Sequence, residues 1–519
     1  MTGSGGTDGL QSRRAAEDDC APRGQGLANT EHNSMTNIDK EIERSMTDKI
    51  RATDRLTIDS VRDNIVGIDT QVPLLDGSHR PYVNFDNAAS TPALRPVADT
   101  IAEFLDWYSS VHRGTGFKSH IATEIYDEAH KIVARFMGAN PDNHTVIFVK
   151  NSTEALNKLA RRLEIGPEEI VLTTLMEHHS NDLPWRAAGR IEHIGIDVNG
   201  ALDEDHLDSL LKKHAGHVRL VAVTGASNVS GFINPIHRIA EKAHAAGAEM
   251  LVDAAQLAPH RAVDMRPVDD PGHIDYTVLS AHKMYAPFGT GALIGRKETF
   301  LKGDPDLVGG GTVRIVTTDE VDWTGLPDKE EAGSPNVVGA VALAKAILCM
   351  EEIGMNALAQ HEAELTAHLL AGLAKIDGIQ VFGLSDPARA GERLGVVPIA
   401  VEELDHHLVA AILSCEAGIG VRNGCFCAHP YLLRLLHVPP EKVEASKQAI
   451  RRDDRREIPG LIRVSFGCYN SKAEVDWFLE ALAKITRHEY RGTYVQDPHS
   501  GEYTAEGFEP DLGEYFVLG

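Results

Sequence analysis

A serine, a histidine and a lysine lie close together in the run Ser280-Ala281-His282-Lys283. The apolar run Tyr276-Thr277-Val278-Leu279 precedes them and predicts a strand, which places the three polar side chains at a strand end. A lysine in this position suits a Schiff base to pyridoxal phosphate, because the hydroxyl and the imidazole beside it can both reach phosphate oxygens. A surface lysine in a turn is the alternative for this run taken alone.

A carboxylate and an amide follow a second strand-like run, in Met250-Leu251-Val252-Asp253-Ala254-Ala255-Gln256. Pyridoxal phosphate needs a carboxylate against its pyridine nitrogen, because the protonated ring then withdraws electrons. Asp253 fits this role, and Gln256 can bond the ring hydroxyl. An aspartate that caps a helix is a common alternative. Two such motifs, each after a strand, are far more specific together than either is alone.

Together the two motifs resemble those of the class V aminotransferase-like enzymes that use pyridoxal phosphate, and most closely the branch of cysteine desulfurases and selenocysteine lyases. The resemblance covers roughly residues 80 to 485. It implies the type I fold of pyridoxal-phosphate-dependent transferases, an α/β fold with a large domain on a mainly parallel sheet and a smaller α+β domain. It also implies a homodimer with the active site at the subunit interface.

Two more strand ends carry residues that the resemblance places at the cofactor. A strand is predicted over 144–148, and Ser152 and Thr153 after it begin a helix, whose free N–H groups and dipole attract phosphate. An ordinary helix cap is the alternative there. The pair His178-His179 follows the next strand, and the resemblance stacks His178 on the cofactor ring as a proton-transfer group. No third ligand lies near this pair in sequence, so no metal is expected.

The residues that bind the substrate are expected in four other segments. Asn87 and Ala88 lie in an Asn-Ala-Ala turn that lines the substrate pocket in the family. Arg113 lies in a segment that resembles one reaching the neighbouring subunit's site, although a charged surface loop is the alternative. In relatives, the match to Asn228 contacts the substrate carboxylate or the cofactor. Arg463 matches the arginine that binds the substrate carboxylate, and its planar guanidinium suits a two-point contact.

Two thiols lie in the run Arg422-Asn423-Gly424-Cys425-Phe426-Cys427. Relatives carry an Arg-x-Gly-x-x-Cys pattern whose cysteine accepts sulfur, and this pattern maps onto Arg422, Gly424 and Cys427, with Arg422 at the substrate. A nucleophilic thiol has to be exposed and partly ionised. Cys425 stays open as a helper, as a resolving thiol or as the nucleophile itself. A Cys-x-Cys metal site and a pair of buried small residues are the alternatives.

Two glycine-bearing loops, at 309–312 and 331–336, resemble loops at the dimer interface of the family. One of them donates a hydroxyl to the partner subunit's cofactor phosphate, and Ser334 is the candidate donor, with Thr312 as the alternative. The chain departs from the family pattern at Lys329, where an arginine is expected. It also departs in the charge-rich run 439–460, which is interpreted as an insertion that covers or reshapes the mouth of the active site.

These residues need a scaffold that brings the ends of several strands together. Between residues 145 and 300, strand-like runs alternate with helix-like runs, which predicts a mainly parallel sheet covered on both faces. The polar motifs in this region follow strands, as expected where an open α/β sheet binds its ligand at the carboxyl ends of its strands. Further along, helices are predicted at 337–353 and 355–376, and strands at 379–382 and 394–400.

Composition and charge set the outer bounds. The 519 residues carry a formal net charge of -25, which argues against nucleic acid or an anionic membrane as partner. The absence of an apolar run long enough to span a membrane, and of a secretory signal, predicts a cytoplasmic location. The predicted organisation is a disordered extension at 1–55, the large domain at 56–335, the small domain at 336–487, and an aromatic and acidic tail at 488–519.

The expected activity is removal of sulfur from L-cysteine, or of selenium from L-selenocysteine, to leave L-alanine. Lys283 would remove the Cα proton, His178 would move protons, and Cys427 would accept the sulfur as a persulfide before its transfer, with an acceptor protein as one recipient. One alternative is another reaction of this cofactor on the same scaffold, such as β-lyase cleavage, epimerisation or transamination. The other alternative is a non-catalytic partner-binding protein.

Overall fold

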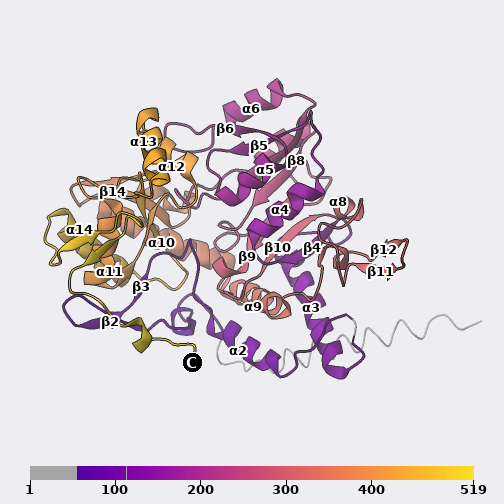
Figure 1. Ribbon diagram of the computed structural model, residues 1–519, viewed down its shortest axis with the longest axis horizontal. Coiled ribbons are helices and arrows are strands. Elements are labelled where there is room, and N and C mark those ends of the chain that lie inside the picture. The colour runs from indigo at the N-terminus through magenta and orange to yellow at the C-terminus, as the bar shows by residue number, and fades with distance from the viewer. Residues whose placement is uncertain (1–54, 113) are drawn as a thin grey trace, which may run out of the picture. The chain divides into compact units, whose positions relative to one another are not determined.

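A computed structural model describes residues 55–112 and 114–519, of which Leu56–Gly519 form one compact unit (Figure 1). The extension predicted to be disordered, up to residue 54, and the candidate substrate residue Arg113 lie outside the described residues. Within the compact unit, a seven-stranded sheet and a four-stranded sheet carry the residues of the candidate site. The domain boundaries given above stay a prediction.

The larger sheet has the strand order β4-β10-β9-β8-β7-β5-β6. Neighbouring strands from β9 to β6 run parallel, whereas β10 runs antiparallel to both β4 and β9. The mainly parallel sheet predicted for this region is therefore confirmed. Its strands are β4 (His144–Val149), β5 (Ile170–Thr174), β6 (Arg190–Ile194), β7 (Val218–Thr224), β8 (Glu249–Asp253), β9 (Tyr276–Ser280) and β10 (Gly291–Arg296).

Helices cover both faces of this sheet, which is why its strands read as continuous apolar runs. In β7, Val221 and Val223 pack into the core on one face, and Leu220 and Ala222 pack into the core on the other. The first core also contains residues of α2 (Arg95–Leu105), α3 (Phe117–Phe136), α6 (Glu204–Lys213), α7 (Ile236–Ala245) and α9 (Val337–Ile353). The second contains residues of α4 (Ser152–Arg162), α5 (Leu183–Ala188) and α8 (Lys297–Leu301).

Helix α9 is apolar on nearly all sides and packs against α2 and α3. Asn336 caps its start, because its side chain accepts a hydrogen bond from the Gly339 N–H at 2.9 Å. The Asn336 amide also donates to the carbonyls of Phe288 and Gly289, at 2.8 and 3.0 Å. These bonds fix the loop that follows Lys283 to the start of a buried helix.

The smaller sheet is antiparallel, with the order β13-β14-β17-β16. Strand β14 begins later than the predicted residue 394, because the Leu394 N–H donates instead to the carbonyl of Gly231, in the loop after β7. The sheet consists of β13 (Ile379–Val381), β14 (Val396–Val401), β17 (Leu461–Ser465) and β16 (Arg422–Gly424), and it packs with α10 (Met355–Leu373), α11 (His406–Ala417) and α14 (Lys472–Thr486).

Two segments near the C-terminus fold beside this sheet. The charge-rich run forms helix α13 (Pro440–Arg451) and a loop, and it follows helix α12 (His429–Leu435). The tail, for which the sequence predicted no element, contains a hairpin of β18 (Tyr494–Gln496) and β19 (Tyr503–Ala505). The Arg455 N–H donates to the Pro498 carbonyl at 2.8 Å and so joins the two segments. Among the described residues, no helix combines the length and apolar character that a membrane crossing requires.

Candidate active site

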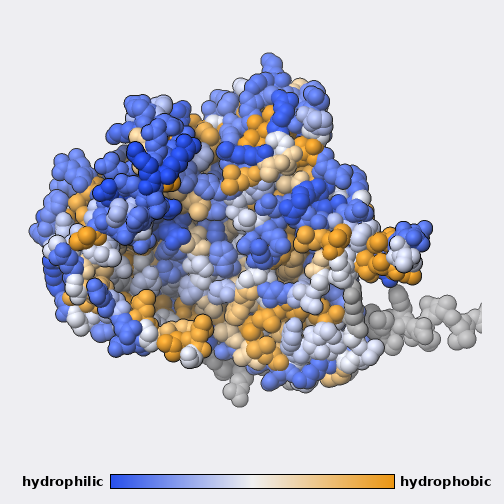
Figure 2. All heavy atoms as spheres, viewed as in Figure 1, coloured by the Kyte–Doolittle hydropathy of each residue, from blue (hydrophilic) through white to orange (hydrophobic). Residues whose placement is uncertain are grey.

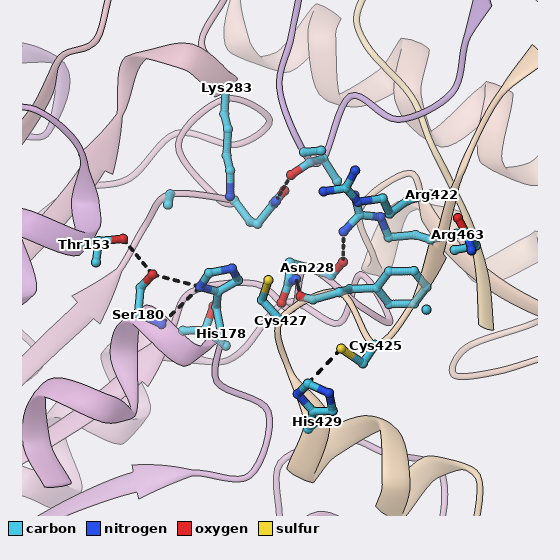
Figure 3. A pocket seen from close by; sticks show the side chains of 18 of the residues that line it. Thr153, His178, Ser180, Asn228, Lys283, Arg422, Cys425, Cys427, His429 and Arg463 are labelled. Carbon is cyan, nitrogen blue, oxygen red and sulfur yellow. Dashed lines mark hydrogen bonds between the residues drawn. The ribbon is translucent and has the colours of Figure 1, made fainter. Parts of the chain in front are cut away.

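A cavity of about 610 Å³ opens where the carboxyl ends of the large sheet's strands meet the edge of the smaller sheet (Figure 3). This volume is in the range of small-molecule sites. The fold brings most of the predicted site residues to its wall: Ala88, Ser152, Thr153, His178, Asn228, Asp253, Gln256, Ser280, His282, Lys283, Arg422, Cys427 and Arg463.

One corner of the cavity presents hydroxyls at the start of a helix. The side chain of Asn151 caps α4 by accepting from the Glu154 N–H, which leaves Ser152 and Thr153 in the first turn. The Ser152 N–H donates to the Ser280 hydroxyl at 2.9 Å, and that hydroxyl donates to the Ser152 hydroxyl at 3.1 Å. The end of β9 and the start of α4 therefore form one polar surface, with the positive end of the helix dipole behind it. Such a surface suits an anion.

Asp253 is the last residue of β8, and Lys283 ends the short 3-10 helix that follows the neighbouring strand β9. Burial lowers the pKa of Lys283 to about 8, although the Asp253 carboxylate raises it in part. Burial also raises the pKa of Asp253, whose carboxylate accepts a hydrogen bond from the Ala255 N–H at 3.0 Å. The residues after Asp253 form turns rather than a helix, so the helix-cap interpretation of this aspartate is wrong. Gln256 donates to the Ala88 carbonyl at 2.6 Å, and this bond joins two residues that line the cavity.

His178 is held as a neutral imidazole. Its Nδ1 accepts a hydrogen bond from the Ser180 N–H at 3.1 Å, so the ring proton is on Nε2. Burial is the main cause that lowers the pKa of His178 to about 3, and the positive charge of Lys283 is the second cause. The Ser180 hydroxyl lies 2.9 Å from the same Nδ1 and 2.7 Å from the Thr153 hydroxyl, which links the histidine to the anion corner.

Arg463 is buried on β17, and its charge is met by a residue that the sequence did not single out. Its Nη2 donates to the Asp86 carboxylate at 2.7 Å, and its Nη1 donates to the Asn228 carbonyl at 3.0 Å. Among the described residues, its Nε is buried without a hydrogen-bond partner. Arg422 lies 3.7 Å from the same carboxylate. Two arginines thus converge on one carboxylate at the cavity wall. Their positive charges can also bind the carboxylate of a ligand.

The two cysteines lie on a tight turn in an uncommon conformation. Phe426 and Cys427 have φ angles of 53° and 54°, and the Ala428 N–H donates to the Cys425 carbonyl at 3.0 Å. A left-handed conformation costs a non-glycine residue about 1–2 kcal/mol, and such strain concentrates at functional sites. Two bonds hold the turn, one from the Asn228 amide to the Phe426 carbonyl at 2.8 Å and one from the His179 N–H to the Cys427 carbonyl at 2.8 Å.

The turn exposes one thiol and partly buries the other. Cys427 is exposed, and Figure 3 shows its sulfur pointing into the cavity. The Sγ of Cys425 lies 3.6 Å from Nδ1 of His429, and burial raises the pKa of this thiol. The sequence did not single out His429. Its spacing of one helical turn after Cys425 is the signal that could have identified this histidine.

Three candidate residues are not at this cavity. Asn87 lies behind its wall, fully buried, where its amide donates to the Ser465 carbonyl at 3.1 Å and its oxygen accepts from the Tyr469 hydroxyl at 2.7 Å. Ser334 lines a separate hollow with His112. The third, Arg113, is not among the described residues.

The mouth of the cavity is built by the two C-terminal segments. Residues of α13 and of the loop after it line the cavity, and so does one residue from the turn of the tail hairpin: Ile450, Arg455, Ile458 and Ser500. His406 and His407, at the start of α11, complete this side. Residues of the charge-rich run therefore line the cavity, and its interpretation as an insertion stays a prediction.

Comparison with known proteins gives consistent relatives. The family model Aminotransferase class-V matches residues 83–478. A cysteine desulfurase of Haloferax volcanii is 32% identical over 430 residues, which cover 80% of this chain and 92% of that protein. A probable cysteine desulfurase of Aeropyrum pernix is 36% identical over 421 residues, which cover 78% of this chain and 95% of that protein.

Solved structures show the same likeness. The apo structure of a cysteine desulfurase from Thermococcus onnurineus superposes with a TM-score of 0.70 at 32% identity, over 84% of this chain and 100% of that one. The cysteine desulfurase CsdA from Escherichia coli, in an S-sulfonic acid form, superposes with a TM-score of 0.68 at 25% identity, over 84% of this chain and 99% of that one. The predicted type I fold is confirmed by these neighbours.

Proposed function

The chain belongs to the class-V aminotransferase family, and we propose that it is a pyridoxal-phosphate-dependent cysteine desulfurase. It converts L-cysteine, or L-selenocysteine, to L-alanine and takes up the released sulfur on Cys427 as a persulfide. The observation that carries this proposal is the exposed Cys427 thiol, which shares one cavity with Lys283, Asp253 and Arg463.

The donor set of the cavity fits pyridoxal phosphate. Lys283 would hold the cofactor covalently, and the buried carboxylate of Asp253 would face its pyridine nitrogen. The start of α4 would bind the phosphate, with hydroxyls from Ser152, Thr153 and Ser280 and with His282. His178 would stack on the ring, while Gln256 would bond its hydroxyl. When bound, this cofactor withdraws electrons from the substrate's Cα and weakens the Cα–H bond.

Arg463 would bind the substrate carboxylate. Its guanidinium is already oriented by Asp86 and Asn228, so little side-chain freedom is lost on binding. Asn228 and Arg422 would complete this end of the site, and Ala88 would form its floor.

The protein's own groups can move the protons that the reaction requires. With a pKa of about 8, Lys283 is a free amine in an appreciable fraction of molecules near neutral pH, and it can take the Cα proton. His178 is neutral, carries its proton on Nε2 and can donate a hydrogen bond from Nε2 within the cavity. The Cys427 thiolate then attacks the substrate sulfur: the new S–S bond forms as the C–S bond breaks, and the electron pair of the C–S bond stays with the carbon that becomes alanine.

The decisive experiment is product analysis with L-cysteine in the presence of an external thiol, comparing wild type with Cys427→Ala. We expect the variant to bind cofactor and substrate, because the groups that hold them are intact, but to form no persulfide and to release less than about 1% of the wild-type sulfide. Cys425→Ala should keep most turnover under these conditions. Cys468→Ala is the matched control, since this half-buried thiol lies outside the cavity.

Two other outcomes would redirect the proposal. Full sulfide release by Cys427→Ala together with an inactive Cys425→Ala would make Cys425 the nucleophile. Full release by both variants, or no sulfide from wild type, would favour a different reaction of the same cofactor.

We also infer a homodimer in a reducing compartment such as the cytoplasm. The cysteines in the described part of the chain are free thiols, which suits that compartment. Ser334 opens to a hollow of its own, as expected of a residue that serves the partner's phosphate rather than its own subunit's. Any acceptor protein would have to reach Cys427 through the mouth beside α13 and the tail hairpin.

A further inference from the structure

The desulfurase reaction uses one of the two thiols in the cavity and leaves Cys425 without a role. Both cysteines line the same cavity and are separated in sequence by one residue, Phe426. Figure 3 shows the Cys425 sulfur directed at His429 and the Cys427 sulfur directed into the cavity. The second thiol therefore lies on the same turn and in the same cavity as the thiol that would carry the sulfur.

Cys425 has a base within reach. Its Sγ lies 3.6 Å from Nδ1 of His429, and that nitrogen lies 3.2 Å from Nε2 of His179. The two rings are parallel, with a 5.1 Å separation and a 7° interplanar angle. Partial burial lowers the pKa of both histidines, so both are neutral near pH 7. His179 Nε2 accepts a hydrogen bond from the His429 backbone N–H at 3.3 Å, so its lone pair is engaged and His429 is the base that faces the thiol.

The turn is the element that would bring the two cysteines within range of a disulfide. Consecutive Cα atoms are about 3.8 Å apart, so a bend places residues two apart within the roughly 4.4–6.8 Å that a disulfide spans. The bond from the Ala428 N–H to the Cys425 carbonyl shows that the chain does reverse here. Phe426 and Cys427 both have positive φ angles in this turn, a conformation that costs free energy in a non-glycine residue.

We propose that Cys425 is a resolving thiol, which attacks the inner sulfur of the Cys427 persulfide and releases the outer sulfur as hydrosulfide. The proposal rests on the proposed function, since it needs the persulfide. The Cys425 proton goes to His429, a Cys425–Cys427 disulfide forms, and the bond between the two persulfide sulfurs breaks with its electron pair on the departing sulfur. The two protein thiols are oxidised, and the outer sulfur is reduced. An external dithiol, as in a small redox protein, then reduces the disulfide for the next cycle.

A single turnover without reductant tests this step. The holoenzyme is reduced, freed of reductant without air, and given one equivalent of L-cysteine; alanine, sulfide and the intact protein mass are then measured. Wild type should release one sulfide per alanine and lose two hydrogen atoms in mass. Cys425→Ser should form the same alanine, release at least tenfold less sulfide and gain one sulfur atom in mass. Cys415→Ser, a half-buried thiol outside the cavity, should behave as wild type.

The role of His429 is tested by its effect on the same step. His429→Gln should form alanine at the wild-type rate but release sulfide several-fold more slowly near pH 7, and higher pH should restore the release because the thiol then ionises without a base. A wild-type protein that keeps its persulfide, or a Cys425→Ser variant that releases sulfide as fast as wild type, would overturn the proposal. Absence of both alanine and persulfide in every variant would instead refute the desulfurase activity on which it rests.

Discussion

Lys283 differs from an ordinary lysine because its side chain is buried and its pKa is lowered. It follows the end of β9 and lines the same cavity as Asp253 and the hydroxyls of Ser152 and Thr153, so it determines where a covalently held cofactor would lie. We expect Lys283→Ala to lose all covalently attached cofactor, as measured by absorbance and by peptide mass after borohydride reduction. Lys150→Ala, a change in an exposed lysine before α4, is the control. A reducible adduct on another residue in Lys283→Ala would contradict the assignment.

The lowered pKa of Lys283 makes a separate prediction about pH. An amine attacks an aldehyde only when it is unprotonated, and burial lowers the pKa of this amine to about 8. The fraction of free amine therefore rises as pH rises through about 8 and levels off above it. The rate at which the apoenzyme takes up pyridoxal phosphate, followed by absorbance, should show this plateau. A rate that keeps rising to the pKa of an ordinary lysine, about 10.4, would show that the pKa is not lowered.

For single residues, a contact can be predicted from the sequence only when the two residues lie close together along the chain. Lys283, Asp253 and Cys427 belong to compact motifs, and their neighbours in sequence suggested their chemistry. The Asp86 carboxylate meets Arg463 across 377 positions, and His179 meets His429 across 250. No local pattern encodes these contacts, because they depend on how two sheets pack. Asn87 shows the same dependence on packing. Its motif lies near the site, but its side chain bonds to the Ser465 carbonyl behind the cavity wall.

The elements follow the same rule. Long periodic segments such as α9 and the buried strands of the large sheet were predictable, because burial on both faces leaves continuous apolar runs. The tail hairpin was not predictable. Its strands are three residues each, and non-local contacts such as the bond from the Tyr494 hydroxyl to Glu416 at 3.0 Å stabilise it. Short strands at an edge have weak propensity signals of their own.

The tail hairpin is predicted to restrict access to Cys427. Its turn contributes Ser500 to the cavity wall and bonds to the loop after α13. Replacing residues 497–502 by Asn-Gly should preserve the pairing of Gln496 with Tyr503, since this dipeptide favours a two-residue hairpin turn. In a Cys425→Ser background, a bulky maleimide should then label Cys427 several-fold faster, while iodoacetamide should label it at an unchanged rate. Equal acceleration of both reagents would indicate a general loosening instead of a wider mouth.

Over the whole molecule, the charge of the cavity opposes that of the chain. The formal net charge is -25, yet Lys283, Arg422, Arg455 and Arg463 all line the cavity. Cationic groups in a partly enclosed site raise the local concentration of anions even in an acidic protein. The cofactor phosphate and the substrate carboxylate are both anions, and the cationic cavity attracts them. The negative charge of the whole chain repels an extended polyanion.

The homodimer is the last prediction, and it belongs to the whole molecule. Hydrophobic side chains gather on the hairpin of β11 (Val313–Val316) and β12 (Val321–Trp323) and on the segment before it (Figure 2). Val308 is 69% exposed and Ile315 is 60% exposed. Exposed apolar residues that cluster in this way are typical of a surface that another subunit covers. The loop that carries Ser334 bonds to this segment, because the Gly333 N–H donates to the Gly310 carbonyl at 2.6 Å.

If this surface is the subunit interface, a carboxylate placed in it is buried twice by the dimer's symmetry. Each buried, unpaired charge costs several kcal/mol, so Val308→Asp combined with Ile315→Asp should weaken the dimer by roughly a thousandfold or more. Sedimentation velocity should show monomers, and cofactor affinity should fall with dissociation because the partner's hydroxyl at Ser334 is lost. Val198→Asp, at a residue 91% exposed in the turn after β6, should stay dimeric and bind cofactor normally. A double variant that stays dimeric would place the interface elsewhere, and a monomeric wild type with full cofactor affinity would refute the shared site.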